Sequence, residues 1–462
     1  MTALNKYMFR EYDVRGHETD DELNIDSVKL IAKAYGTFLR SRGITSAVVG
    51  HDNRDMSEVF YRTAISALRS TGIDVIGIGM SLTPQMYWAQ YYFKTEGGLA
   101  ITASHNPVGW NGMKMALGYS ATLDQEQIAG LYTIAEIGEF AAGEGSFKEE
   151  NIVEAWMSDL LSRVTLHRPL KILLNTANAT SSFFSPELFR RFGCEVVEYN
   201  TNPDPSYPHY PPNPANIDMI TDTGKKTLEV GADVGIGIDA DGDRLGVTDE
   251  QGNVIWPDRY MILLSRLVLK DHPGANIVFD VKVSESLPED IAAHGGVPVM
   301  CTTGNPYIKR KIKEIAAPFG GEQSGHIFFT DNFYGFDDGN FAGLKLLEYI
   351  SGLTEPLSKT MESTPYYIST HAMYAMATDA RKYEIVQELT NQFKQEGYRV
   401  VDINGARVYM HDGWGLVRAT SNLPAVEVRF EAKTEEGLEK IRALFKEKLA
   451  QFPEVSPEWG SA

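Results

Sequence analysis

Three aspartates at alternate positions, between two short apolar runs, constrain the fold and chemistry of this chain more than any other feature. Residues 236–247 read Ile-Gly-Ile-Asp-Ala-Asp-Gly-Asp-Arg-Leu-Gly-Val. The apolar residues on both sides predict two short buried strands joined by a tight turn. Oxygen ligands on such a turn can converge on one divalent cation such as Mg2+, so Asp239, Asp241 and Asp243 are the predicted metal ligands. Arg244 follows at once and can neutralise an anionic substrate, which favours a metal-dependent phosphate enzyme.

Two other interpretations of this segment remain open from the residues alone. Asp and Gly are turn formers in their own right, so the segment is also compatible with a plain acidic turn. The aspartates also match positions one, three and five of an EF-hand loop, and Glu250 matches position twelve. Against an EF-hand, position six is Arg244 where Gly is expected, and the flanks resemble strands rather than helices.

Charge and cysteine content limit the partners that we expect. The 462 residues carry 43 basic and 62 acidic side chains, a net charge of −19, which argues against a nucleic-acid partner. Two cysteines far apart, Cys194 and Cys301, indicate no disulfide framework and fit a cytoplasmic protein. The first residues lack the apolar stretch of a signal peptide, and no apolar run is long enough to span a bilayer, so no membrane partner is expected.

The order of apolar and polar segments predicts one α/β unit used three times, followed by a different C-terminal unit. Strands alternate with helices up to about residue 315, which is typical of mostly parallel sheets. We expect strands at 46–50, 74–78, 170–174, 195–199, 232–238, 276–280 and 297–300, and helices at 60–68, 186–192 and 307–315. The last hundred residues predict an α+β domain, with strands at 366–370, 400–403, 407–410 and 425–430 and helices at 383–393 and 434–449. Thr434 is placed to cap the last helix.

Residues 102–107, Thr-Ala-Ser-His-Asn-Pro, predict a sharp turn at the end of a short strand. Pro107 disfavours helix at the preceding residue, so Ser104 can present its hydroxyl to a cleft. Lys114 follows ten residues later. A Ser-His-Asn-Pro sequence is also a good turn without any function, and adjacent Ser and His side chains usually point apart, which argues against a nucleophile–base pair.

Two later segments carry clustered polar side chains. Residues 320–326, Gly-Gly-Glu-Gln-Ser-Gly-His, can present Glu322 to vicinal sugar hydroxyls, or form only a glycine-rich loop. Residues 415–424 bring Arg418 together with two hydroxyls and an amide, which suits a phosphate cradle or, alternatively, an ordinary turn with an exposed arginine.

Taken together and in order, these segments resemble the α-D-phosphohexomutase superfamily, and within it the phosphomannomutase/phosphoglucomutase group. The resemblance opens at residues 9–16, Phe-Arg-Glu-Tyr-Asp-Val-Arg-Gly, and covers essentially the whole chain. It implies an α/β fold of three similar domains with mixed, mostly parallel sheets, plus a C-terminal α+β domain related to the TATA-binding protein, around a central cleft. The implied domains are residues 1–149, 150–253, 254–365 and 366–462.

The resemblance also implies roles for individual residues. Ser104 would carry a phosphoryl group and, with the three aspartates, hold Mg2+. Arg15 and Lys114 would assist proton transfer near the phosphoserine, for which Lys114 needs a lowered pKa that neighbouring cations can supply. The other implied catalytic residues are His105, Arg244 and His326. The implied substrate-binding residues are Lys282, Gly304, Asn305, Lys309, Glu322, Ser324, Arg418, Thr420, Ser421 and Asn422.

Several positions depart from the pattern of the family. Ala240 stands where the metal loop usually has Gly, which would be strained if the position needs a positive φ. Asn305 replaces a common His and cannot titrate near neutral pH. Residues 418–422, Arg-Ala-Thr-Ser-Asn, shuffle the groups of the usual phosphate loop, and residues 175–179 replace a more glycine-rich turn. Gln323 is more typical of phosphoglucosamine mutases.

The implied reaction is reversible phosphoryl transfer between the 1- and 6-positions of a mannose or glucose phosphate, through a phosphoserine and a bisphosphorylated sugar. Glucose 1,6-bisphosphate would serve as activator or intermediate, and the protein would be a monomer or dimer. Two alternatives stay open: a phosphoglucosamine mutase, suggested by Gln323, and a catalytically silent binder of sugar phosphates, suggested by Asn305 and the altered phosphate loop.

Overall fold

The computed structural model describes residues 4–410, 412–420 and 423–460. Two compact units make up the chain: Met1–Tyr260 with Ser324–Thr360, and Met261–Gln323 with Met361–Ala462. Each unit is described by itself below. Among the described residues, no helix has both the length and the apolar character needed to cross a membrane.

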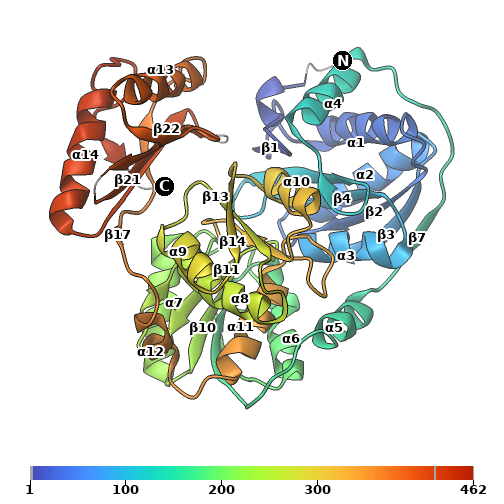
Figure 1. The fold of residues 1–462 in the computed structure, drawn as a ribbon. Helices are drawn as coiled ribbons and strands as arrows, with labels where there is room; N and C mark the ends of the chain where they lie inside the picture. Colours follow the sequence, from blue (N-terminus) through green and yellow to red (C-terminus); the bar gives the residue numbers. More distant parts are fainter. Residues whose placement is uncertain (1–3, 411, 421–422, 461–462) are drawn as a thin grey trace. The chain divides into compact units, whose positions relative to one another are not determined.

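The first sheet of the first unit, whose strands β2, β3 and β4 are labelled in Figure 1, has a parallel centre and an antiparallel edge. Its order is β1-β5-β4-β2-β3-β7, with β6 paired to β5, and β5 runs antiparallel to both of its neighbours β4 and β1. Strand β5 therefore returns beside the end of β4 and pairs Lys114 with Ala100. The strands are β1 (Val14–His17), β2 (Ser46–His51), β3 (Asp74–Met80), β4 (Gly97–Ile101), β5 (Trp110–Leu117), β6 (Ala121–Thr122) and β7 (Phe147–Glu149), and the helices are η1 (Lys6–Met8), α1 (Ile25–Arg40), α2 (Ser57–Ser70), α3 (Thr83–Phe93) and α4 (Gln125–Ile137).

The second sheet of this unit contains the predicted acidic turn. Its order is β12-β11-β10-β8-β9, and the hairpin β10–β11 is antiparallel with Ile238 opposite Leu245. Every residue of β10 and β11 is buried, so the predicted pair of buried strands is confirmed and the EF-hand alternative, which needs flanking helices, is wrong. The elements are α5 (Val153–Leu161), β8 (Lys171–Asn175), η2 (Thr180–Phe183), α6 (Ser185–Phe192), β9 (Glu195–Tyr199), α7 (Ile217–Val230), β10 (Val234–Ile238), β11 (Leu245–Asp249) and β12 (Val254–Ile255).

The segment Ser324–Thr360 rejoins the first unit and packs on this hairpin. It contains β16 (Ile327–Phe329), α11 (Gly339–Ser351) and the start of α12 (Leu357–Glu362). The Gly339 N–H donates to the Gly242 carbonyl oxygen at 2.9 Å. A Cβ at Gly339 would lie 2.4 Å from the Arg244 carbonyl oxygen, so only glycine permits this approach.

The second unit begins with a parallel three-stranded arrangement in the order β14-β13-β15. It comprises most of α8 (Pro257–Asp271), β13 (Asn276–Asp280), α9 (Ser286–Ala293), β14 (Val297–Cys301), α10 (Asn305–Ile315) and β15 (Phe319–Gly321).

The C-terminal sheet is antiparallel, in the order β19-β20-β21-β22-β18-β23, with β17 paired to β22. Alternate residues of β22 lie on opposite faces of the sheet. Val426, Val428 and Phe430 join the core with α13 and α14, whereas Glu427 lies on the other face. The Gly437 N–H donates to Thr434 Oγ1 at 3.0 Å, which confirms the predicted cap. The elements are β17 (Ile368–Ser369), β18 (Met373–Met376), α13 (Lys382–Gln395), β19 (Arg399–Val401), β20 (Ala406–Met410), β21 (Gly413–Ala419), β22 (Ala425–Ala432), α14 (Glu435–Leu449) and β23 (Trp459–Gly460).

Candidate active site

The serine turn has the sharp geometry that the sequence predicts. Strand β4 ends at Ile101, and Ser104 adopts a left-handed backbone with φ of 51°. The Ser104 N–H donates to Thr102 Oγ1 at 2.9 Å, which closes the turn. Ser104 is buried in the first unit, and its Oγ lies 3.4 Å from Asp239 Oδ2. The turn thus directs the serine hydroxyl at the acidic loop.

The three aspartates converge as the sequence predicts. Asp239, Asp241 and Asp243 are all buried, and one oxygen from each lies within 4.8 Å of the others. Lys114 Nζ lies 2.6 Å from both Asp241 Oδ2 and Asp243 Oδ2. The Thr83 hydroxyl, at the start of α3, donates to Asp241 Oδ2 at 2.7 Å. A cation and a hydroxyl therefore already contact the carboxylates that would hold a metal.

Two buried carboxylate oxygens of this cluster fit a metal ligand role. Asp241 Oδ1 and Asp243 Oδ1 have no hydrogen-bond partner. A buried carboxylate oxygen without a partner is costly, and a divalent cation would satisfy it. All the donors are hard oxygens, the type that Mg2+ prefers. The cluster can therefore hold a metal of this class.

The crowded charges change the acidity of the groups around the triad. Burial and the neighbouring Asp243 and Asp241 raise the pKa of Asp239 well above its usual range. For Asp243, burial raises the pKa, but Lys114 and His326 outweigh it and the pKa is lowered. Burial lowers the pKa of Lys114, whereas Asp241 and Asp243 raise it more, so the pKa lies well above its usual value. The expected lowered pKa of Lys114 is therefore wrong for the protein without metal, because carboxylates rather than cations contact the ammonium.

His105 lies closer to the serine than adjacent side chains usually do. Its Nδ1 is 3.2 Å from Ser104 Oγ, within hydrogen-bond distance. The general expectation that the two side chains point apart is wrong here, because the left-handed backbone at Ser104 turns the chain between them. Burial and the nearby Arg244 and Arg15 hold the pKa of His105 well below its usual range, so its imidazole is neutral at physiological pH.

Arg15 braces the same turn from β1. Its Nη1 donates to Asn106 Oδ1 at 2.6 Å and to the Ala103 carbonyl oxygen at 3.2 Å. Its Nε donates to Asp13 Oδ2 at 2.8 Å. The guanidinium is therefore held beside the serine turn by a carboxylate and by the turn itself.

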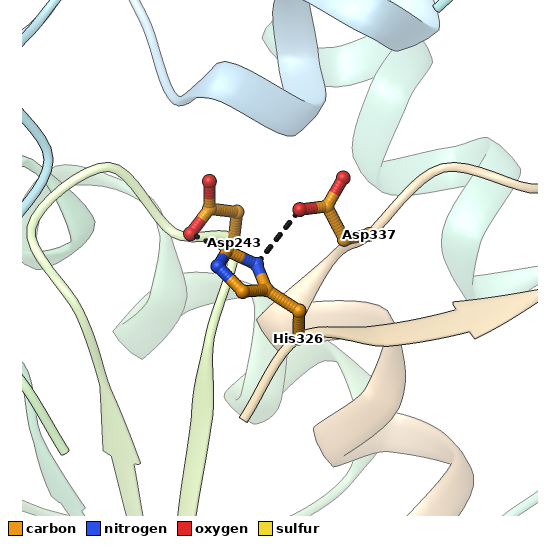
Figure 2. A group of neighbouring side chains, drawn as sticks. All are labelled: Asp243, His326 and Asp337. Atoms are coloured by element: carbon orange, nitrogen blue, oxygen red, sulfur yellow. Dashed lines mark ion pairs between the residues drawn. The ribbon is translucent and has the colours of Figure 1, made fainter. Parts of the chain in front are cut away.

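A histidine between two carboxylates orients Arg244. His326 Nδ1 lies 2.8 Å from Asp337 Oδ2 and 3.5 Å from Asp243 Oδ1, and Figure 2 shows the imidazole between the two carboxylates. Arg244 Nε donates to His326 Nε2 at 3.1 Å. Because an arginine can only donate, the imidazole proton must be on Nδ1, facing the carboxylates. These three side chains also place ligand atoms within 4.8 Å of one another.

The departures in the metal loop and in the 175–179 turn have different consequences. Ala240 does not adopt a positive φ, so alanine is tolerated there; Gly242 has φ of 80° and is the position that needs glycine. Ala177 and Asn178 do adopt left-handed backbone, with φ of 48° and 62°. The replacement of glycine thus strains residues 177–178 but not the acidic loop.

In the second unit, the predicted sugar-binding residues gather around the start of α10. Glu322 is buried, and its Oε1 accepts from the Gly304 N–H at 3.1 Å. Asn305 is the first residue of α10, and Lys309 lies on its second turn. Asp280, at the end of β13, accepts from the Gln323 N–H at 3.0 Å, which fixes the loop that carries Glu322. Ser324 belongs to the first unit, where it is half-buried.

Lys282 and Arg418, 136 positions apart, meet at one carboxylate of the second unit. Glu427 Oε2 accepts from Arg418 Nη1 at 2.5 Å, and Glu427 Oε1 lies 3.7 Å from Lys282 Nζ. Burial raises the pKa of Glu427, but Lys282 and Arg418 outweigh it and the pKa is lowered. Arg418 is buried, so the alternative of an exposed arginine at a strand end is wrong.

The rest of the predicted phosphate loop is partly described. Thr420 is buried and its Oγ1 donates to the Leu423 carbonyl oxygen at 2.5 Å. Ser421 and Asn422 lie outside the described residues.

Sequence reasoning missed several residues that contact the predicted ones, among them Thr83, Asp337 and Glu427. Glu427 alternates with apolar residues in β22, which is the signal of a charged second face on a buried strand. Asp337 directly precedes Asp338, the cap of α11, and Thr83 begins α3. Neither of these two positions has a signal beyond its place at a helix start.

Similar proteins cover nearly the whole chain. Models of the phosphoglucomutase/phosphomannomutase family match residues 6–142 (alpha/beta/alpha domain I), 153–252 (domain II), 256–367 (domain III) and 375–448 (C-terminal domain). A phosphomannomutase/phosphoglucomutase of Pseudomonas syringae is 34% identical and covers 98% of this chain and 96% of its own. A phosphoglucomutase of Neisseria gonorrhoeae is also 34% identical and covers 98% and 99%.

A solved structure also resembles this chain over nearly its whole length. A phosphoglucomutase/phosphomannomutase family protein of Burkholderia thailandensis superposes with a TM-score of 0.91, at 33% identity, over 98% of this chain and 99% of its own. The fold of three α/β domains and a distinct C-terminal domain, with these relatives, defines a mutase, an enzyme of the isomerase class. The chain belongs to the phosphoglucomutase/phosphomannomutase family, within the α-D-phosphohexomutase superfamily.

Proposed function

We propose that this enzyme transfers a phosphoryl group reversibly between the 1- and 6-positions of a glucose or mannose phosphate, with Ser104 as the carrier. The observation that carries the proposal is the Ser104 hydroxyl, 3.4 Å from Asp239 on a left-handed turn, in the same unit as the acidic triad, Lys114 and Arg244. The names of the relatives support glucose and mannose phosphates as the substrate class.

Two half-reactions of opposite direction would complete the cycle. In the first, the bond between Ser104 Oγ and phosphorus breaks while a sugar hydroxyl oxygen bonds to the same phosphorus, and the proton of that hydroxyl ends on the departing Ser104 Oγ. The product is a bisphosphorylated sugar, which turns around so that its other phosphate returns to Ser104. Glucose 1,6-bisphosphate would be this intermediate for glucose and would also rephosphorylate an enzyme that has lost its phosphate.

The residues around Ser104 suit these steps. Asp239, Asp241 and Asp243, with a phosphoserine oxygen, would hold Mg2+, which supplies charge stabilisation to the transferring group when it is bound. Arg244, oriented by His326, would place its free guanidinium nitrogens toward the same oxygens. Lys114, whose ammonium group contacts Asp241 and Asp243, would assist proton transfer near Ser104.

Residues of the second unit would bind the rest of the sugar phosphate. The Glu322 carboxylate can accept hydrogen bonds from two vicinal hydroxyls. Gly304, Asn305 and Lys309 would line the same sugar. Lys282, Arg418, Thr420, Ser421 and Asn422 would hold the phosphate that is not reacting.

A steady-state assay with Mg2+ and a trace of glucose 1,6-bisphosphate tests the proposal. Glucose 1-phosphate, mannose 1-phosphate and glucosamine 1-phosphate are each followed to the 6-phosphate, with Ser104→Ala in parallel. We expect turnover of the first two that depends on Ser104. A kcat/KM for glucosamine 1-phosphate well above the others would assign the chain to that substrate instead, and full activity of folded Ser104→Ala would reject the carrier role.

A further inference from the structure

Arg54, on the loop after β2, contacts the main chain of the serine turn four times. Its Nη2 donates to the carbonyl oxygens of Ser104 and Asn106, at 2.6 Å each. Its Nη1 donates to the carbonyl oxygens of Pro107 and Trp110, at 2.9 and 3.1 Å. One guanidinium thus binds carbonyl groups along the whole turn from the serine to the start of β5.

The turn needs such a partner because its conformation is intrinsically unfavourable. A non-glycine residue in left-handed backbone, as at Ser104, costs about 1–2 kcal/mol. The hydrogen bond from Arg54 to the Ser104 carbonyl group is buried and the other three are partly buried, and carbonyl groups away from water need a partner. A planar guanidinium with several fixed donors can bind them together, whereas an ammonium group cannot reproduce that geometry.

Arg54 is itself held rigidly. Its side chain is 4% exposed, and its Nε lies 3.3 Å from Asp52 Oδ2. Asp52 Oδ1 accepts from the Arg54 N–H at 3.0 Å and from the Ser57 hydroxyl at 2.5 Å. Asn111 Nδ2, on β5, donates to Ser57 Oγ at 3.0 Å, so the network returns to the strand that follows the turn. The carboxylate compensates the buried charge and fixes the direction of the guanidinium.

We propose that Arg54 is a positioning residue for phosphoryl transfer: it holds the Ser104 turn in the geometry from which Oγ faces the acidic triad. The inference rests on the proposed role of Ser104 as carrier. Arg54 donates to the main chain rather than to the reacting atoms, so it acts on the placement of Oγ. A displacement of a reacting group by about 1 Å costs on the order of 100-fold in rate.

The test compares Arg54→Lys and Arg54→Met with a matched control, Arg62→Met. Arg62 lies on α2, is two-thirds exposed, and pairs only with Glu58 in the contacts described for its side chain. Each protein is phosphorylated with glucose 1,6-bisphosphate and the phosphorylated fraction is counted by mass spectrometry. The rate constant for transfer from phosphorylated enzyme to glucose 1-phosphate is then measured in a single turnover, beside steady-state kcat and KM and a thermal melt.

We expect the single-turnover rate constant of Arg54→Lys to fall about 100-fold, with KM changed less than about 3-fold and the control at the wild-type value. A purely structural role would lower the fraction that accepts phosphate but leave the rate constant of the phosphorylated molecules unchanged, and that result overturns the inference. If Arg54→Met does not fold, the folded Arg54→Lys protein decides. Ser104→Ala separates the two proposals: turnover without Ser104 refutes the carrier role, whereas an inactive Ser104→Ala with a wild-type Arg54→Lys rate refutes only the role of Arg54.

Discussion

Asp338 gives the first unit a pH-dependent stability that one substitution should remove. Its carboxylate caps α11, where Oδ1 accepts from the Phe341 N–H at 3.0 Å, but Oδ2 is buried without a hydrogen-bond partner. Burial, with smaller contributions from Asp337 and Asp243, raises the pKa of Asp338 from 3.8 to about 7. Asn keeps the capping oxygen and cannot ionise, so Asp338→Asn isolates the charge.

The sign and size of the effect follow from the two pKa values. The native state keeps the Asp338 proton up to about pH 7, whereas the unfolded chain releases it near pH 3.8. The native state therefore binds more protons in this window, and the free energy of unfolding falls as the pH rises through it. The shift of about 3.2 pKa units corresponds to about 4 kcal/mol at 1.36 kcal/mol per unit, of which about 2.5 kcal/mol falls between pH 5 and pH 8.

Thermal melts of wild type and Asp338→Asn at pH 5 and pH 8, in EDTA at fixed ionic strength, test this. We expect the advantage of the variant to grow by about 4 °C from pH 5 to pH 8, since a unit of this size, with an unfolding entropy of about 2.1 cal/mol/K per residue, shifts by about 1.6 °C per kcal/mol. Asp124→Asn is the control, because Asp124 caps α4 in the same way from a half-buried position. A difference in Tm between Asp338→Asn and wild type that is the same at both pH values would refute the reasoning.

Three further substitutions test other parts of the account. Lys114→Met removes the cation between two buried carboxylates, so in EDTA it should destabilise the protein by about 3–5 kcal/mol. Excess Mg2+ should restore more stability to the variant than it adds to wild type, and equal thermal melts of the two proteins in EDTA would contradict this. Asp337→Asn keeps an acceptor for the His326 N–H and should lose less than about 10-fold in kcat, whereas Asp337→Leu should lose about 100-fold or more. Equal losses in kcat would show that Asp337 acts through its charge and not by orienting His326. Thr434→Ala should lower stability by about 1 kcal/mol in a urea melt, and an unchanged midpoint would remove the cap from the account.

The spacing of apolar residues along the sequence predicted the helices and strands whose formation depends on nearby residues alone. The acidic hairpin, the last helix with its cap and the alternation of strands and helices follow from apolar spacing and turn chemistry, which act over a few residues. The antiparallel return of β5, which brings Lys114 to the acidic loop, does not follow, because strand direction depends on pairing partners outside the segment. Strands β18 and β21 were missed for the same reason, because both are defined by their neighbours in the C-terminal sheet.

Some residues of the candidate site could likewise be predicted from the sequence, and others could not. The three aspartates stand out because carboxylates at alternate positions of one turn can converge on a cation, and Ser104 was assigned because its turn resembles the family pattern. Arg54 and Glu427 do not stand out, since a single arginine after a strand or a single glutamate within one is common. Their importance lies in what the fold places against them: four carbonyl groups for Arg54, and two cations for Glu427.

Direct observation of phosphate on Ser104 during turnover tests the central claim. The enzyme is mixed rapidly with glucose 1,6-bisphosphate and then with glucose 1-phosphate, and the peptide that contains Ser104 is analysed by mass spectrometry at each time. The account predicts that a phosphoryl group appears on Ser104 and leaves it at a rate at least as fast as kcat. Turnover at the full rate while Ser104 stays unmodified throughout would contradict it.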